Sequence, residues 1–451
     1  MNRFRLAEHG TTVRTEVMGG VTTFLTMSYI VFVNPAILSA AGLDFAAVAV
    51  VTALAAAIFT AAMGLITNLP LALASGLGLN AVVAFDIIIG REVSPAVGMA
   101  CVVIEGLIAL VLVLAGLREA VVRSVPPAIK LAIGVGIGLF ITLVGLREGG
   151  IVVNNLATGI GLADLSAGPP MIALAGILVA GALAVANVRG SIMIGIATSV
   201  VLGLIFGVLE GPDGVVDMPD GDNFAIVGDA LSANALEGAL TVALIPIIFT
   251  LFMTDFFDTI GTAFAVGSAG NLVDEDGELP NTRKMLAVDS AAAAGGGILG
   301  VSSVTTYVES GAGVAEGART GLASLVTAAL FALTIFFVPI IALVGQGVPY
   351  GEDTFIHPAI APALVMVGYL MIRLVRGIDW EAPESALPAF FIIAGIPLTF
   401  SIAAGIGLGV ISYVLVMAAT GKARDVHPLM WGIAPFFVAF FAADWLSANV
   451  F

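Results

Sequence analysis

Two carboxylates lie three residues apart in an otherwise apolar stretch. Asp255 and Asp258 fall within residues 254–262, TDFFDTIGT, and a helix places residues at this spacing on one face. Because a carboxylate inside a bilayer costs on the order of 3 kcal/mol or more, it should face a cavity and mark a substrate or proton path. We expect Asp255 to bind substrate and to take part in proton coupling. For Asp258 two interpretations stay open: proton coupling, or a structural bond between neighbouring helices.

A third carboxylate lies in a second stretch of the same kind. Within residues 302–310, SSVTTYVES, Glu309 follows Thr305, Thr306 and Tyr307. We count Glu309 and the neighbouring Thr306 as substrate-binding candidates. The alternative for Glu309, as for Asp255, is a buried structural hydrogen bond to a neighbouring segment.

An amide and an aromatic ring complete the candidate site. Asn80 lies in residues 75–81, SGLGLNA, in the first half of the chain. Its position there corresponds to that of Glu309 in the second half. Its amide can both donate and accept hydrogen bonds, although it could instead cap a helix. Phe24, in the first apolar run, could stack on a flat ligand, or it could pack against small neighbours. We expect a further carboxylate, Glu105 in the fourth run, to be structural.

The segments that carry Asn80 and Glu309 are poor continuous helices. Residues 69–85 and 300–313 each contain a short β-prone stretch followed by glycine and small polar residues. Irregular backbone is tolerated within a bilayer only where it lines a cavity or is buried in protein. We therefore expect a short strand followed by a half-helix in each segment, with free N–H groups and a positive dipole end facing a polar ligand.

The composition is that of a polytopic membrane protein. Of the 451 residues, 59% are hydrophobic and 11% charged, whereas soluble domains have roughly 25% charged residues. Apolar runs near the roughly 20 residues needed to cross a bilayer recur along the chain, and the first is expected to be a retained helix rather than a signal peptide. The single cysteine, Cys101, excludes an intrachain disulfide and a thiolate metal cluster. The net charge of −16 argues against a nucleic-acid partner.

The apolar segments form two sets of seven. The first set comprises residues 17–34, 46–67, 71–85, 94–116, 126–146, 171–188 and 191–208. The second set comprises residues 239–266, 284–298, 301–316, 319–345, 358–375, 386–400 and 402–420. Because seven is odd, the second set must enter the membrane from the opposite side, which defines an inverted repeat. Weak similarity between residues 127–147 and 358–373, at the same ordinal position, supports this repeat.

The basic residues indicate an orientation. With a cytoplasmic amino terminus, all but two of the 16 lysine and arginine residues fall on the inner side, the exceptions being Arg91 and Arg147. An excess of basic residues in cytoplasmic loops is the rule for membrane proteins. The pattern predicts a multi-pass protein of the cell membrane with both termini in the cytoplasm. The last apolar run, residues 428–451, is expected at the inner interface or packed on the bundle, although a fifteenth crossing stays open.

Four long motifs carry a family resemblance. Residues 15–35, TEVMGGVTTFLTMSYIVFVNP, together with residues 75–81, 254–262 and 302–310, resemble the AzgA-like hypoxanthine/guanine/adenine permeases of the nucleobase/ascorbate (xanthine/uracil) permease superfamily. The resemblance implies an all-α fold of 14 transmembrane segments in a 7+7 inverted repeat. It also implies a core domain of segments 1–4 and 8–11, a gate domain of segments 5–7 and 12–14, an elevator-like movement between them, and a possible homodimer.

The resemblance also implies boundaries and roles. The parts implied by the resemblance are residues 15–116 and 239–345 for the core and 122–208 and 356–420 for the gate. The composition separately predicts an acidic extracellular loop at residues 209–238 and an apolar tail on the cytoplasmic side at residues 421–451. By motif, Asp255 and Glu309 become the substrate-binding carboxylates, Asn80 a further ligand, and Asp258 a proton-coupling or structural partner.

The predicted function is secondary active import of purine nucleobases of the hypoxanthine, guanine, adenine or xanthine type, by proton symport. Sodium coupling stays open because the composition is strongly acidic. One alternative is an anion permease of the same fold, although a sulfate-like substrate would favour a basic or neutral site. A channel would need no pair of interrupted helices. An enzyme is not expected, because no motif supplies a nucleophile with its base, and neither a cofactor nor a metal is predicted.

Overall fold

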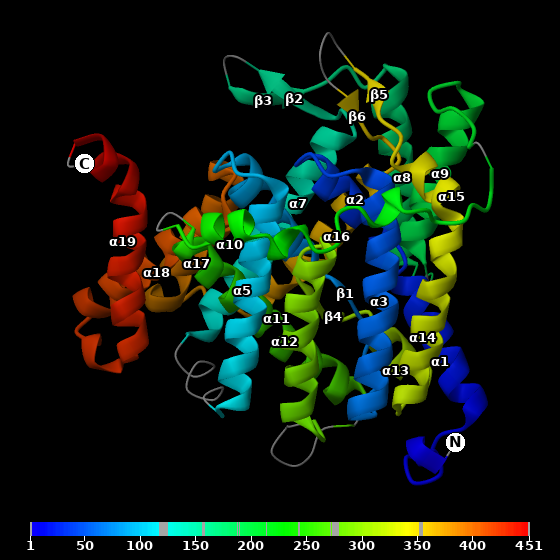
Figure 1. The fold of residues 1–451 in the computed structure, drawn as a ribbon. Helices are drawn as coiled ribbons and strands as arrows, with labels where there is room; N and C mark the ends of the chain where they lie inside the picture. Colours follow the sequence, from blue (N-terminus) through cyan, green and yellow to red (C-terminus); the bar gives the residue numbers. More distant parts are fainter. Residues whose placement is uncertain are drawn as a thin grey trace.

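A computed structural model describes residues 2–116, 125–155, 158–186, 188, 190–212, 214–241, 244–270, 272, 279–350 and 355–449. Within these ranges most of the chain is helical, as Figure 1 shows. Seven of the described helical spans are long and apolar enough to cross a membrane by length and composition. Shorter apolar helices account for several other expected segments.

Up to α9, the described residues of the first half form ten helical elements, a 3-10 turn included, and three strands. In order they are α1 (Val13–Met27), α2 (Ile30–Ser39), α3 (Phe45–Thr67), β1 (Leu73–Ser75), α4 (Leu77–Ala81), the π-helix Val82–Ile89, α5 (Pro95–Leu114), α7 (Pro127–Glu148), β2 (Val152–Asn155), β3 (Gly159–Leu162), α8 (Gly168–Val185) and α9 (Ser191–Ile205), preceded by a 3-10 turn at Asn2–Phe4. Hydroxyl and carboxylate caps fix several helix starts: Thr12, Asp44 and Ser94 accept hydrogen bonds from the first turns of α1, α3 and α5.

The second half begins with a short helix and again has long helices followed by a strand and a second short helix, but here the strand hairpin comes before α16, whereas in the first half it comes after α7. Apart from short 3-10 turns, its described elements are α10 (Ala233–Ala239), α11 (Ile245–Ala269), α12 (Thr282–Leu299), β4 (Val304–Thr306), α13 (Ser310–Ala315), α14 (Gly321–Thr334), α15 (Val338–Val344), β5 (Val348–Pro349), β6 (Phe355–Ile356), α16 (Ala361–Ile372), α17 (Pro383–Thr399), α18 (Ile402–Ala419) and α19 (Pro428–Asn449). Each of the fourteen expected segments overlaps one or more of these elements. Residue 122, the predicted start of the first gate part, lies outside the described residues.

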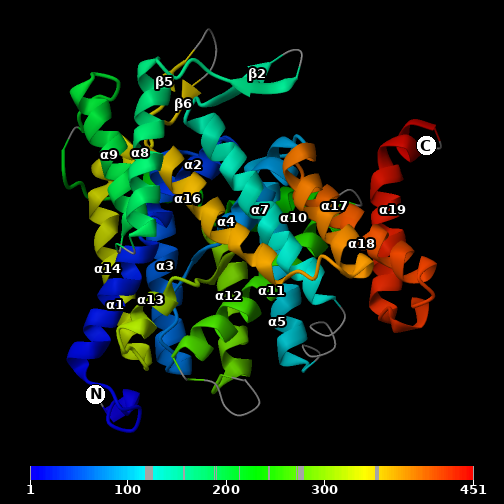
Figure 2. The same ribbon diagram turned by 180° about the vertical axis from the view of Figure 1, so that it is seen from behind.

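Two groups of helices can be distinguished by their contacts. The first group consists of α1–α5 and α11–α15, in which α3 packs on α14 and α5 on α12. The second group consists of α7–α9 and α16–α18, in which α7 packs on both α16 and α17. Figure 2 shows α7 and α16 side by side in the second group. Each group therefore combines helices from both halves of the chain.

Glycines allow the helices within each group to approach closely. A Cβ atom on Gly321 of α14 would lie 2.0 Å from the carbonyl oxygen of Gly64 on α3. A Cβ atom on Gly368 of α16 would lie 2.4 Å from the carbonyl oxygen of Gly138 on α7. Both distances are too short for any side chain, so the backbones touch at these crossings, as small residues permit between membrane helices.

The two interrupted segments meet as a pair of antiparallel strands. Leu73, Ala74 and Ser75 of β1 pair with Thr306, Thr305 and Val304 of β4. The ladder extends to the N–H of Gly76, which donates to the carbonyl of Ser303 at 2.8 Å. Each strand is followed by a short helix, α4 or α13, which is the order that the sequence predicts. Two edge strands thereby satisfy each other's backbone in the middle of the first group.

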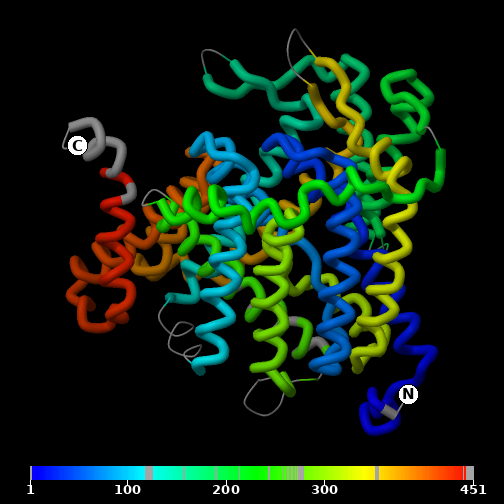
Figure 3. Tube along the Cα trace, viewed as in Figure 1, coloured from blue at the N-terminus to red at the C-terminus, as the bar shows by residue number. Residues whose placement is uncertain are grey.

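The carboxyl-terminal run forms a helix that packs on the bundle. In Figure 3 the amino terminus lies at the bottom, and α19 runs beside α18 at the side of the molecule. A Cβ atom on Gly407 of α18 would lie 2.7 Å from the ring of Phe437, so α19 and α18 are in close contact there. The rings of Phe249 and Phe436 also meet, with centroids 6.3 Å apart, and they join α11 to α19.

Candidate functional site

Asp289 of α12 joins three segments at the strand pair. Its Oδ1 accepts hydrogen bonds from the backbone N–H of Thr306 at 2.9 Å and from the Thr306 hydroxyl at 2.7 Å. Its Oδ2 accepts from the hydroxyl of Thr259 on α11 at 2.6 Å. Because the carboxylate is 3% exposed and bonded on both oxygens, it fixes β4 between α11 and α12.

Asp289 is absent from the sequence-based candidates. It stands alone in an alanine-rich and glycine-rich run, residues 287–297, AVDSAAAAGGG. The cost of placing a carboxylate in a bilayer, which identified Asp255, applies to Asp289 equally, so the same reasoning would have identified Asp289 as a candidate.

Asp255 lies one helical turn before Thr259 and is almost fully buried. The hydroxyls of Thr259 and Thr305 lie 2.8 Å apart, which ties α11 to β4 one turn after Asp255. The Oδ1 atom of Asp255 has no hydrogen-bond partner among the described residues. A buried carboxylate oxygen without a donor is costly, so the atom is available to a ligand or a proton.

Asp258 differs from Asp255 in its exposure. The Asp258 side chain is exposed, whereas that of Asp255 is 2% exposed. Asp258 nevertheless interacts electrostatically with Asp289 and Glu309, which come from two other segments. Asp258 is therefore the more accessible of the two α11 carboxylates, although protein atoms surround much of it.

Glu309 is held by a residue from the first helices. It directly precedes α13, and its Oε1 accepts a hydrogen bond of 2.5 Å from the hydroxyl of Tyr29. Tyr29 lies at the break between α1 and α2 and is 2% exposed. The sequence suggested stacking for an aromatic ring in this region, but the hydroxyl of Tyr29 is what reaches the site.

Asn80 presents a free donor at the other strand. The Ser75 hydroxyl lies 2.8 Å from Asn80 Oδ1, and the side chain of Asn80 is fully buried. Its Nδ2 atom has no hydrogen-bond partner among the residues that the structure describes. Tyr307 holds the same turn by donating from its hydroxyl to the carbonyl of Ser75. A buried amide N–H₂ and the free oxygen of Asp255 thus offer a donor and an acceptor near one strand pair.

Thr306 and Phe24, which the sequence predicts to bind substrate, contact other protein residues in this structure. The hydroxyl of Thr306 donates to Asp289, so it is already used within the protein. The ring of Phe24 packs edge-on against Phe331, with centroids 5.1 Å apart.

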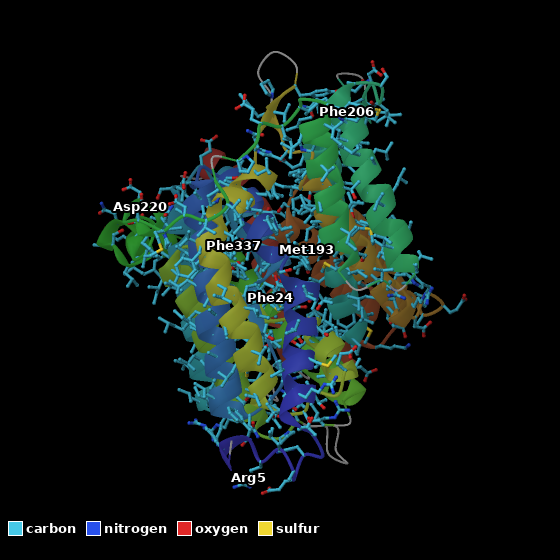
Figure 4. The ribbon with its side chains drawn as sticks, turned by 90° about the vertical axis from the view of Figure 1, so that its right-hand side faces the viewer. Arg5, Phe24, Met193, Phe206, Asp220 and Phe337 are labelled. Carbon is cyan, nitrogen blue, oxygen red and sulfur yellow. The ribbon has the colours of Figure 1, made fainter. Side chains whose placement is uncertain are left out.

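Phe24 also lines an apolar cavity of about 390 Å³ between α1, α2, α9 and α15. Figure 4 shows Phe24, Met193 and Phe337 around this region. None of Asn80, Asp255, Asp258, Glu309 or Thr306 is among the described residues that line the cavity. The structure therefore brings together the strand-pair residues but leaves Phe24 on a separate apolar surface, and its contact with substrate stays a prediction.

Glu105 of α5 completes the set of buried acids. Its Oε1 accepts from the hydroxyl of Ser303 at 3.2 Å, and its Oε2 has no partner among the described residues. No ion pair between described residues links Glu105, Asp255, Asp289 or Glu309 to a basic side chain. The described residues also contain no group of three or more His, Cys, Asp or Glu side chains arranged to hold a metal ion.

Comparison with known proteins gives full-length matches. Residues 14–408 match a protein family described as the permease family. A putative permease of Methanocaldococcus jannaschii is 41% identical over 434 residues, which cover 96% of each chain. The guanine/hypoxanthine permease PbuG of Bacillus subtilis is 39% identical, with 97% of this chain and 98% of PbuG covered. The adenine permease AdeQ of Escherichia coli is 38% identical, with 96% and 94% covered.

A solved structure shares the fold. The transmembrane domain of a cyanobacterial bicarbonate transporter, BicA, superposes with a TM-score of 0.61 over 87% of this chain and 97% of that domain. The two sequences are 16% identical, so this likeness concerns the fold alone.

Proposed function

Since the chain belongs to the permease family that matches its residues 14–408, and is thus a transporter and not an enzyme, we propose that it carries purine nucleobases across a membrane. Relatives that are named guanine/hypoxanthine and adenine permeases, at 39% and 38% identity over almost the whole chain, support this substrate class. Hypoxanthine, guanine, adenine and xanthine all present ring N–H donors and ring nitrogen or carbonyl acceptors on a flat heterocycle.

The observation that carries the proposal is the set of unsatisfied polar atoms at the strand pair. Asp255 Oδ1 is a buried acceptor without a donor, and Asn80 Nδ2 is a buried donor without an acceptor. A purine edge supplies the complementary pair, an N–H group and a carbonyl or ring nitrogen. Leaving such groups unpaired costs about 1–3 kcal/mol each, so a ligand that satisfies both is favoured over one that satisfies neither.

Glu309 and Asp258 extend this site in the proposal. Glu309 is oriented by Tyr29, and its second carboxylate oxygen is available to another N–H of the heterocycle. Asp258, the more accessible of the two α11 carboxylates, exchanges protons with water during transport. Phe24 and Thr306 stay as candidates for contact in another conformation of the carrier, since their present partners are apolar residues and Asp289.

The transport cycle that we propose is proton symport by an elevator-like movement. The first helix group acts as the core and the second as the gate, in fourteen crossings with both termini in the cytoplasm and the acidic stretch 209–238 outside. The protein resides in the cell membrane, and a homodimer is compatible with this scheme. Sodium in place of the proton is the alternative coupling ion.

An anion permease is the second candidate function, because BicA shares the fold. An anion site needs positive charge or neutral donors, and the acids around the strand pair have no basic partner among the described residues. The acidic site therefore favours a neutral heterocycle over sulfate or bicarbonate.

Uptake into proteoliposomes tests the proposal. The purified protein should exchange radiolabelled hypoxanthine for unlabelled purines, and neither sulfate nor bicarbonate should compete. An imposed inward proton gradient should drive accumulation, and a protonophore should abolish it, while a sodium gradient alone should have no effect. Sulfate exchange without hypoxanthine exchange would favour the anion permease, and accumulation driven by sodium would replace the proton.

A further inference from the structure

A polar contact and an aromatic contact join the two helix groups at the start of α18. Asp86, in the π-helix Val82–Ile89 of the first group, accepts hydrogen bonds from the backbone N–H groups of Ile402 at 2.7 Å and Ala403 at 3.0 Å. The ring of the preceding residue, Phe85, packs edge-on against Phe400, with centroids 5.8 Å apart. Two consecutive residues of the first group therefore hold the turn between α17 and α18 of the second group.

Three phenylalanine rings and one guanidinium group form a cluster at this turn. Phe140 of α7 packs edge-on against Phe400 and against Phe85, with centroids 4.8 Å and 5.6 Å apart. The guanidinium carbon of Arg147, further along α7, lies 5.4 Å from the centroid of the Phe400 ring. Edge-on ring pairs attract each other beyond the burial of their surface, and a cation near a ring is attracted to it. The ring of Phe400 is therefore held from both helix groups.

The backbone of Phe400 shows that this ring is held against a local cost. Phe400 ends α17 in the left-handed region, with a φ of 55°. Glycine or asparagine is usual at such a helix end, and a bulky residue is rare there. Strained conformations of this kind persist where the surroundings hold them, and they gather at switch regions. The contacts of the Phe400 ring offset the strain of its backbone.

The line of contacts between the two groups starts beside the candidate purine site. α4, which carries Asn80, runs directly into the π-helix Val82–Ile89, and π-helical turns are frequent at functional sites. α4 also packs on α7, because a Cβ atom on Gly78 would lie 3.0 Å from Cγ2 of Ile137. Phe140 follows Ile137 by about one helical turn. The contacts therefore extend from the helix of Asn80 to the start of α18.

The corresponding place in the first half has different surroundings. Residues 191–196, SIMIGI, at the start of α9 resemble residues 401–406, SIAAGI, at the start of α18. The start of α9 borders the apolar cavity of about 390 Å³, which Gly190 lines together with Leu25 of α1. A Cβ atom on Gly190 would lie 4.0 Å from the carbonyl oxygen of Leu25. The first group is thus bonded to the start of α18, whereas a cavity separates it from the start of α9.

We propose that Phe85, Asp86, Phe140 and Phe400 form a latch that shuts the purine site from one side of the membrane, and that the latch is closed in this structure. The inference rests on the proposed function. In the proposed inverted repeat, α9 and α18 start on opposite sides, and the start of α18 is extracellular. A purine reaches that side only when Phe85 leaves Phe400 and Asp86 releases α18, and the two residues move together because they are consecutive.

Cysteine accessibility tests the latch. Cys101→Ala removes the single cysteine, and Asp258→Cys then places a thiol at the more accessible carboxylate of α11. A membrane-impermeant maleimide, added to sealed vesicles of either orientation, should label this thiol slowly from the extracellular side. Phe400→Ala removes two edge-on ring pairs, so we expect it to raise that rate about tenfold. The cytoplasmic rate should stay unchanged.

Phe390→Ala is the matched control. Phe390 lies on the same helix, α17, but its side chain is 55% exposed and takes no part in the latch. Its labelling rates should equal those of the parent protein. Unchanged labelling in folded Phe400→Ala would overturn the latch, and an equal rise from both sides would do so as well, because it would indicate general loosening. A rise from the cytoplasmic side alone would keep the latch and reverse the orientation.

A second variant keeps the test decisive if Phe400→Ala does not fold. Phe85→Leu retains apolar volume but loses the edge-on contacts, so we expect a rise of about threefold in the same labelling rate. An unchanged rate in this variant would count against the latch. The labelling needs no purine, so failure of the latch is separate from failure of the function. Hypoxanthine exchange by the unmodified protein with unchanged labelling in the variants would reject the latch alone, and absence of exchange with the expected labelling would reject the purine substrate alone.

Discussion

The hydroxyl of Tyr29 donates a hydrogen bond of 2.5 Å to Glu309, a residue 280 positions further along the chain. The contact joins the break between α1 and α2 to the start of α13. It therefore links the two halves of the sequence at the candidate site and fixes the direction in which the Glu309 carboxylate points.

Tyr29→Phe should weaken purine binding while leaving the fold intact. The ring keeps its buried position, but Glu309 loses a donor, and hydrogen bonds to charged groups are worth about 1.5–3 kcal/mol. We expect the Kd for hypoxanthine to rise roughly 10-fold or more, measured by equilibrium binding to purified protein. Tyr369→Phe, at an exposed tyrosine of α16, is the control. An unchanged Kd in Tyr29→Phe would show that Glu309 does not need this donor.

Asp258→Asn should separate binding from accumulation. Asp258 is exposed and beside other acids, whereas Asp255 and Glu309 are placed to contact the heterocycle. We expect Asp258→Asn to bind hypoxanthine but to reach no more than the external concentration, while Asp255→Asn and Glu309→Gln lose binding itself. Binding and concentrative uptake measured side by side check this split, and normal concentrative uptake by Asp258→Asn would contradict it.

Asp289→Ala should destabilise the strand pair. Three hydrogen bonds to Thr306 and Thr259 disappear, and two of their donors are left buried without partners. A loss of about 1–3 kcal/mol per unsatisfied group predicts a clearly lower Tm in detergent and loss of transport. Asp289→Asn retains an acceptor for the Thr306 N–H, so its Tm should lie between that of Asp289→Ala and that of the unmodified protein. A Tm unchanged in Asp289→Ala would mean that β4 is held by its other contacts.

The sequence predicts the interruption of the helices better than it predicts their contacts. Pro70, Gly76 and the β-branched run before Glu309 are local features, so a strand followed by a helix could be expected in each segment. The pairing of Leu73 with Thr306 joins residues from the two halves, and no local pattern determines that register. The same limit applies to Tyr29 and Glu309.

The sequence predicts which types of residue form the candidate site better than it predicts where each side chain points. Asp255, Glu309 and Asn80 stand out because a charged or amide side chain in an apolar segment requires a partner or a cavity. Phe24 and Thr306 have no such requirement, since a phenyl ring packs anywhere apolar and a hydroxyl can bond to a neighbouring carboxylate. The structure accordingly places the Phe24 ring against Phe331 and the Thr306 hydroxyl against Asp289.

Asp86→Ala should affect both stability and the movement between the two helix groups. Asp86, in the π-helix Val82–Ile89 of the first group, accepts from the backbone N–H groups of Ile402 at 2.7 Å and Ala403 at 3.0 Å in α18 of the second group. Loss of a helix cap costs about 0.5–2 kcal/mol, so we expect a lower Tm. If the groups move against each other, this contact must break in each cycle, and its removal should change the rate of exchange.

Asp44→Ala is the matched control for Asp86→Ala. Asp44 caps α3 through the N–H of Ala47 at 2.8 Å, and that bond lies wholly within the first group. It should lower the Tm by a similar amount without altering the exchange rate per folded molecule. Equal exchange rates in both variants would indicate that the bond from Asp86 to α18 is preserved during transport.

Gly321→Val should prevent α3 and α14 from packing. A Cβ atom at Gly321 would lie 2.0 Å from the carbonyl oxygen of Gly64, and the obstacle is backbone, which cannot rotate aside as a side chain could. Overpacking of this kind typically costs about 1–3 kcal/mol or more, and here it would separate two helices that flank the strand pair. We expect little monodisperse protein by size-exclusion chromatography. Gly432→Val, at a glycine of α19 with no atom within 4 Å of an added Cβ, is the control and should behave as the unmodified protein does. Normal yield and Tm in Gly321→Val would mean that α3 and α14 can move apart without loss of the fold.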